Sequence, residues 1–149
     1  RISGGALLVA GEAGVMFRSE DDGESWEVID SPYEGSFFGV SGTGDRDVAL
    51  AFGLRGNLFR SEDAGLTWAQ LESGTTSTLM GAGIDQSGKI TIVGNSGSVL
   101  LSKDGGKTFK ERIRKNRLGN ISLVYVGGRR LVVVGESGVS LTTPSGENL

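Results

Sequence analysis

The chain offers few side chains that could perform chemistry, and the residue types that it lacks narrow the choice further. It contains no Cys and no His. Thiol nucleophiles, thiolate metal ligands and the commonest general base are therefore excluded. Carboxylates, arginines and two tyrosines, Tyr33 and Tyr125, remain. We expect no catalytic constellation, no metal site and no cofactor in this chain.

Carboxylates and tyrosines would suit a glycoside hydrolase of the sialidase type. Such an enzyme needs three arginines, a Tyr–Glu nucleophile pair and an acid Asp, whereas ordinary glycosidases need two facing carboxylates. Tyr125 is expected on an inner strand, without a Glu beside it, and Asp85 falls at the end of another. Tyr33 and Glu34 stand together in the segment 31–36, which could form a sugar-binding platform or a plain proline turn. Binding is favoured, and hydrolysis remains the alternative.

Basic residues gather in one stretch of an acidic protein. Between Lys103 and Arg117 there are seven basic and two acidic residues, although the net charge of the chain is −3. We expect Arg114, Lys115 and Arg117 to project from a loop, with Arg55 on the same face one unit away. Such a patch could hold an acidic partner, or it could be a solvated strand end. The negative net charge argues against a nucleic-acid partner.

An eight-residue motif occurs three times in the chain, at 19–26, 61–68 and 102–109, with intervals of 42 and 41 residues. A period near 40 indicates stacked structural units. In each copy of the motif, here called a box, the Asp can accept hydrogen bonds from backbone N–H groups of the turn, and the Gly can adopt a positive φ. The final aromatic ring is expected to fill the gap between neighbouring sheets. The residues with these structural roles are Ser19, Asp21, Gly23, Trp26, Ser61, Asp63, Gly65, Trp68, Ser102, Asp104, Gly106 and Phe109.

A Gly-x-x-Gly turn precedes each box, and a fourth such turn follows at Gly135–Gly138. Short apolar runs flank each turn and another run opens each unit, which favours strands over helices. Four strands in about 40 residues are typical of one β-propeller blade. The expected first strands of the units are 37–40, 79–84 and 121–126, and the second strands are 6–10, 48–52, 90–93 and 131–134. The third strands are 15–18, 57–60, 98–101 and 139–141, and a short fourth strand is expected after each of the three boxes.

The Ser-x-Asp phrase resembles the Asp-box, also called the bacterial neuraminidase repeat. Its pairing with an upstream Gly-x-x-Gly turn is most similar to the propeller family of photosystem II assembly and stability factors and their non-photosynthetic bacterial relatives. The resemblance covers nearly the whole chain. It implies a non-catalytic scaffold that binds a protein client, and an exported or periplasmic location.

The same resemblance leaves a second function open. Asp-boxes also occur in sialidases, other glycosidases and sorting receptors, where they lie at the blade periphery. A sialidase-like glycoside hydrolase or a carbohydrate-binding propeller is therefore the alternative. Assembly factors of the family carry an arginine-rich patch that contacts an unassembled client, but that patch does not align with this chain residue by residue.

The strand count predicts an all-β fold with about three and a half blades of four antiparallel strands. We expect a single segment, 1–149, with repeats at about 1–31, 36–73, 77–114 and 119–149. Closed propellers have about 4–8 blades, and the resemblance implies seven.

The ring is therefore expected to be incomplete. A fourth box should begin at Thr143, but its Asp and Trp are missing. We interpret the chain as the C-terminal half of a larger propeller, processed or excised because it begins with Arg, and an obligate homodimer is the competing interpretation. No apolar run approaches the roughly 18–20 residues that would predict membrane insertion.

Overall fold

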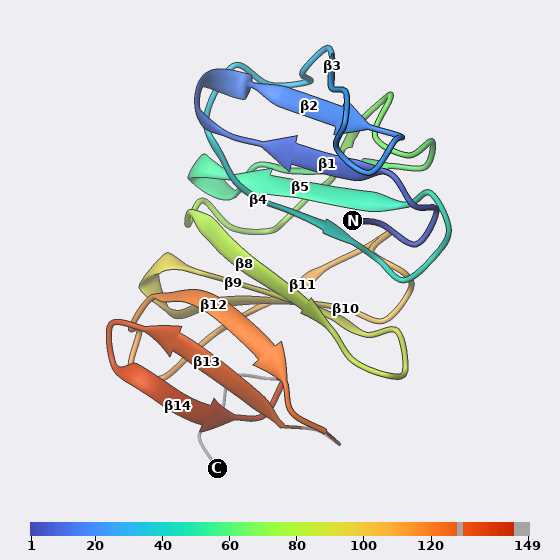
Figure 1. The fold of residues 1–149 in the computed structure, drawn as a ribbon. Helices are drawn as coiled ribbons and strands as arrows, with labels where there is room; N and C mark the ends of the chain where they lie inside the picture. Colours follow the sequence, from blue (N-terminus) through green and yellow to red (C-terminus); the bar gives the residue numbers. More distant parts are fainter. Residues whose placement is uncertain (128–129, 145–149) are drawn as a thin grey trace.

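The computed structural model describes residues 1–127 and 130–144 and consists of β-strands joined by tight turns. Four antiparallel sheets follow one another along the chain, from blue to red in Figure 1. Within the described residues the sheets contain three, four, four and three strands, as predicted. The all-β fold of a partial propeller is confirmed.

The two outer sheets each have three strands in the described part of the chain. The first sheet contains β1 (Leu7–Ala10), β2 (Met16–Ser19) and β3 (Glu27–Val28). The last sheet contains β12 (Asn120–Tyr125), β13 (Leu131–Gly135) and β14 (Gly138–Thr142). Most of the degenerate fourth box, residues 145–149, lies outside the described residues, as do residues 128–129 of the turn before β13.

The two middle sheets are complete blades of four strands. The second sheet contains β4 (Phe37–Gly42), β5 (Ala49–Gly53), β6 (Leu58–Ser61) and β7 (Ala69–Gln70). The third contains β8 (Leu79–Ile84), β9 (Ile90–Gly94), β10 (Ser98–Ser102) and β11 (Lys110–Ile113). Strand β4 contacts β8, and β8 contacts β12, so the first strands of successive units lie together.

The hydrophobic core lies between successive sheets. Leu50 of the second sheet and Leu100 of the third are fully buried in one such layer. Val99 of the third sheet packs with Leu131 and Val133 of the last sheet in another. Because strand side chains alternate between two faces, each middle sheet can contribute to the layers on both sides. Burying one such side chain stabilises the fold by about 1.5–3 kcal/mol, so each sheet depends on its neighbours.

The first three Gly-x-x-Gly turns form single 3-10 turns, η1 (Glu12–Gly14), η2 (Leu54–Gly56) and η3 (Asn95–Gly97). Their middle residues, Ala13, Arg55 and Ser96, have φ values of 52°, 55° and 55°. This left-handed conformation is uncommon for residues other than glycine. The sequence pattern did not predict it, because none of these three residues is of a type that favours it.

The last hairpin differs from the other three. Gly135 pairs directly with Gly138, so only two residues form the turn, and the register of β14 is shifted by one residue relative to the third sheet. A shift of one residue moves every side chain to the opposite face of a strand. Leu141 is 38% exposed, whereas Leu100, at the equivalent position 41 residues earlier, is fully buried. The faces of β14 are therefore reversed.

Each box is held by the same set of hydrogen bonds. Ser19 Oγ donates to Asp21 Oδ1 at 2.8 Å and accepts from the Gly23 amide at 2.9 Å. Asp21 also accepts bonds from the amide and hydroxyl of Ser25. These bonds hold the pKa of Asp21 well below its usual range, at about 2, with the Ser25 hydroxyl as the largest cause. Equivalent bonds form in the second and third boxes.

The expectation that every box aromatic fills an inter-sheet gap is wrong for Trp26. Its side chain is 44% exposed, whereas Trp68 and Phe109 are half-buried against the apolar clusters. The second and third boxes lie against the sheet that precedes them, as the proximity of Gly65 to Leu8 shows. No sheet precedes the first among the described residues, so the Trp26 ring has no neighbouring sheet to pack against.

Candidate functional site

One side of the molecule carries both the Gly-x-x-Gly turns and the connections between sheets. The Phe37 amide, at the end of the first connection, donates to Gly11 O at 2.9 Å. Farther along, the Asn95 amide donates to Thr78 O at 2.9 Å. Each turn is therefore fixed to the start of a sheet by backbone bonds, which gives this side a defined shape. We call it the connection face.

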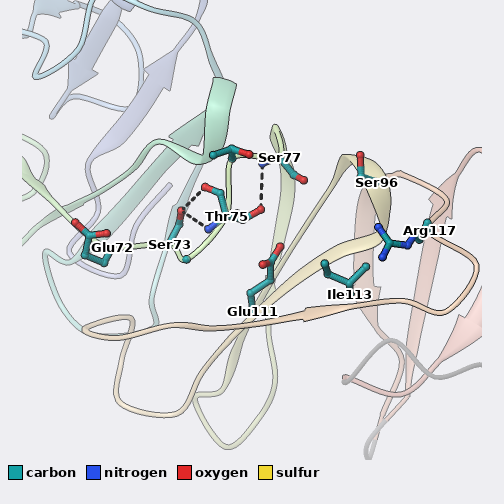
Figure 2. A pocket seen from close by; sticks show the side chains of 10 residues that line it. Glu72, Ser73, Thr75, Ser77, Ser96, Glu111, Ile113 and Arg117 are labelled. Carbon is teal, nitrogen blue, oxygen red and sulfur yellow. Dashed lines mark hydrogen bonds between the residues drawn. The ribbon is translucent and has the colours of Figure 1, made fainter.

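An open cavity of about 520 Å³ lies on the connection face, between the second and third sheets. Figure 2 shows Glu72 and Ser73 on one side of it, Ser96 and Arg117 on the other, and Glu111 between them. Its lining consists of Glu72, Ser73, Gly74, Thr75, Thr76, Ser77, Ser96, Glu111, Ile113 and Arg117.

The cavity wall formed by residues 72–77 is held by its own hydroxyl groups. Ser73 Oγ donates to Thr75 O at 3.2 Å, and Thr75 Oγ1 accepts from the Ser77 amide at 3.0 Å. Across the cavity, Glu111 Oε1 accepts from Ser98 Oγ at 2.9 Å. These bonds leave hydroxyl, carboxylate and guanidinium groups around one exposed apolar side chain, Ile113. Such a lining can contact an extended polar segment.

The fold divides the basic stretch instead of forming one patch from it. Arg114 does not project into solvent as expected, and only 5% of the residue is exposed. Its Nη1 donates to Asn120 Oδ1 at 2.9 Å, and burial lowers the pKa of the guanidinium. Lys115 is exposed but lies outside the cavity lining, whereas Arg117 belongs to it. Arg55 is exposed at the tip of η2, also outside the lining.

The two tyrosines do not face the cavity. The Tyr33 ring stacks on Phe59 at a centroid distance of 6.0 Å and meets Phe37 edge to face, so it is half-buried against the core and does not form an exposed platform. Glu34 beside it is exposed. The Tyr125 hydroxyl bonds to Thr91 Oγ1 at 2.7 Å, and burial raises the pKa of the phenol.

Of the residues that line this cavity, sequence reasoning singled out Arg117 but not Glu111. A partial signal was available, because Glu111 and Ile113 alternate with Lys110 and Arg112 along one strand and so face the other way. The described residues contain no group of three or more His, Cys, Asp or Glu side chains that could hold a metal ion. No helix among them is long and apolar enough to cross a membrane.

Comparison with known proteins supports the fold. No protein-family model matches the sequence, and no curated protein matches it. A structure described as YCF48 bound to D1 peptide is similar with a TM-score of 0.67 at 18% identity, over 98% of this chain and 49% of that one. YCF48 from Cyanidioschyzon merolae gives a TM-score of 0.64 at 20% identity, over 95% and 49%.

An enzyme is also among the similar structures. An ancestral GH74 enzyme gives a TM-score of 0.80 at 15% identity, over 97% of this chain and 22% of that one. The chain thus spans about half the length of the YCF48 structures and less than a quarter of the enzyme. At these identities the likeness establishes the fold alone: the chain is folded as part of a β-propeller.

Proposed function

We propose that the chain is a non-catalytic part of a propeller that binds a segment of a client protein in the cavity of the connection face. The observation that carries this proposal is the cavity itself, with Arg117 at one side, a hydroxyl-rich wall and the exposed Ile113. Hydroxyl groups and a guanidinium can bond to a peptide backbone or to its carboxylates. The YCF48 structure bound to a peptide lends support, because it has a similar fold.

The test begins with a library of displayed peptides selected on the native chain, and the affinities of selected peptides are then measured by fluorescence anisotropy. Thr76→Trp would fill the cavity from an exposed position, and Arg117→Ser would remove its cation. We expect each substitution to weaken binding about tenfold. Arg46→Ser, at an exposed arginine outside the cavity lining, is the matched control. Equal losses in all three variants would refute the proposal.

Glycoside hydrolysis is the second candidate function. Glu72 and Glu111 line the same cavity, and glycosidases act with two carboxylates on either side of the bond that is cleaved. The GH74 enzyme adds support at the level of fold. A panel of fluorogenic glycosides, with a sialoside among them, decides the matter. Turnover that is lost in Glu111→Gln would establish hydrolysis, and absence of turnover by a folded chain would leave client binding.

We also propose that further blades cover the first and last sheets, supplied either by the missing half of a longer propeller or by a second copy of this chain. Both outer faces are apolar, with Val9 and Val28 exposed on the first sheet and Val124, Val139 and Leu141 on the last. Faces of this composition are buried wherever two described sheets meet. Contiguous exposed apolar patches mark interaction surfaces.

A further inference from the structure

A second cavity, of about 550 Å³, lies on the third sheet beside the end of the last one. Four basic side chains line it, namely Lys89, Lys103, Lys110 and Arg112. Leu101 and Pro144 add apolar surface. We call this cavity the basic groove, and client binding on the connection face assigns it no role.

Two of the four cations stand where the other sheets carry different residues. In the first sheet the equivalent positions are Glu27 and the buried Ile29, and in the second they are Ala69 and Leu71. Ile29 and Leu71 each pack into the apolar layer shared with the following sheet. The third sheet has Lys110 and Arg112 at these positions. The surface of the third sheet that faces the outer edge of the last sheet is therefore basic.

The strand register fixes the direction of these two cations. Lys110 lies opposite Leu101, and Arg112 lies opposite Val99. Directly opposed residues in an antiparallel pair point to the same face of the sheet. Val99 and Leu101 belong to the apolar layer shared with the last sheet. Lys110 and Arg112 therefore point toward the side on which the last sheet lies, where the described residues include no fourth strand.

The two carboxylates of the groove, Asp85 and Asp104, do not pair with Lys110 or Arg112, although Asp85 interacts electrostatically with Lys89. Asp85 Oδ1 accepts bonds from the Ser87 amide at 2.7 Å and the Lys89 amide at 3.0 Å within its own turn. Asp104 is bonded inside the third box. Lys103, Lys110 and Arg112 form no ion pair with a carboxylate of the described residues. The first sheet shows the contrasting case, since Arg18 there pairs with Glu27 at 2.6 Å.

We propose that the basic groove binds an extended acidic segment of another polypeptide, whose carboxylates pair with Lys110 and Arg112. An extended strand places alternate side chains on one face, which matches the alternate spacing of these two cations. The N-terminal end of this chain is not available for the purpose, because Ile2 is buried with Ala49 between the first two sheets. The residues that follow Pro144 include a single acidic side chain, Glu147, which cannot pair with all four cations of the groove.

The probe is a fluorescein-labelled peptide of alternating Glu and Thr, and the control peptide has Gln in place of Glu. Binding to the full chain is measured by fluorescence anisotropy. We expect saturable binding of the Glu peptide alone, weakening as salt rises from about 50 to about 300 mM. The double variant Lys110→Ser, Arg112→Ser should bind the Glu peptide about tenfold more weakly.

The matched control is Arg46→Ser, Lys115→Ser, which removes the same charge at exposed positions outside both cavity linings and should leave affinity within about twofold. Thermal melts verify that both variants are folded. The reversed variant Lys110→Glu, Arg112→Glu should instead bind a Lys–Thr peptide, which a general loss of structure could not produce.

Four results would overturn the proposal. The Gln peptide could bind as well as the Glu peptide, or the two double variants could lose affinity equally. A single-stranded oligonucleotide that displaces the Glu peptide at lower concentration would assign the groove to nucleic acid. Binding only by a chain that ends at Pro144 would show that residues 145–149 fill the groove themselves. None of these results bears on client binding at Arg117.

Discussion

Leu8 of the first sheet occupies the space into which any side chain on Gly65 would have to fit. A Cβ atom at Gly65 would lie 2.5 Å from Leu8 Cδ2. Beside this contact, Arg18 Nε donates to Ala64 O at 2.9 Å. The second box therefore joins two sheets, in addition to closing the turn within its own sheet.

We expect Gly65→Ala to destabilise the chain for two reasons, the clash with Leu8 and a φ of +90°. Gly74→Ala is a control that isolates the second reason, since its φ is +77° and no atom lies within 4 Å of the added methyl group. The left-handed conformation costs about 1–2 kcal/mol in both variants, and the clash should add about 1–2 kcal/mol in Gly65→Ala. Urea unfolding measures the difference, and equal losses would contradict the packing argument.

Stability should fall in acid because of the box aspartates. The bond from the Thr108 hydroxyl, followed by the Thr108 amide and Ser102, lowers the pKa of Asp104 from 3.8 to about 2. A carboxyl whose pKa is lowered by folding stabilises the fold above its unfolded pKa, and this contribution is lost as pH falls through the folded value. The free energy of unfolding should therefore decrease between about pH 4 and pH 2.

The variant Asp104→Asn tests this dependence. It should be less stable than the native chain at pH 7, and the difference in stability should disappear near pH 2. Because the carboxylate is exposed to solvent, this difference should be small. Asp30→Asn, at an exposed Asp without a side-chain hydrogen bond in the described residues, should show no such convergence. Urea midpoints at several pH values are the measurement. A stability difference between Asp104→Asn and the native chain that stays constant from pH 7 to pH 2 would show that the Asp104 carboxylate does not cause the loss of stability in acid.

The two tryptophans should differ in their contribution to stability. Trp68 packs against Met16 and other buried side chains of the first two sheets, so Trp68→Ala should cost about 3 kcal/mol. Trp26 is 44% exposed, and Trp26→Ala should cost under about 1 kcal/mol. Acrylamide should quench the fluorescence of Trp26 more strongly, as single-tryptophan variants would show. Similar costs for both substitutions would mean that Trp26 is covered in solution.

The apolar outer faces should cause the chain to associate with itself when no further blades are supplied. Val28 is 76% exposed on the first sheet, so Val28→Glu should leave folding intact and reduce association. Gln86→Glu adds the same charge at an exposed turn residue and should have no effect. Light scattering over a range of concentrations gives the mass of each variant. A native chain that stays monomeric throughout would argue against a second copy as the covering partner.

The sequence by itself determined the sheets and their succession. Local signals were sufficient here, because apolar runs of strand length alternate with Gly-rich turns and each box closes on its own residues. Bonds such as Ser102 Oγ to Asp104 Oδ1 span two positions and recur wherever the phrase recurs. A repeated local pattern therefore predicted both the fold class and the number of strands.

The tertiary structure alone decided which parts of these elements meet. Arg114 belongs to a basic stretch in the sequence but is buried beside Asn120, because the following sheet packs over it. Leu141 aligns with a core residue but points outward, because the last turn is tighter and shifts β14 by one residue. Lys110 and Arg112 face one side and Glu111 the other, so a single stretch of sequence contributes to two separate cavities. Contacts between sheets and the tightness of the last turn set these outcomes, and the repeated pattern of apolar runs and Gly-rich turns does not record either.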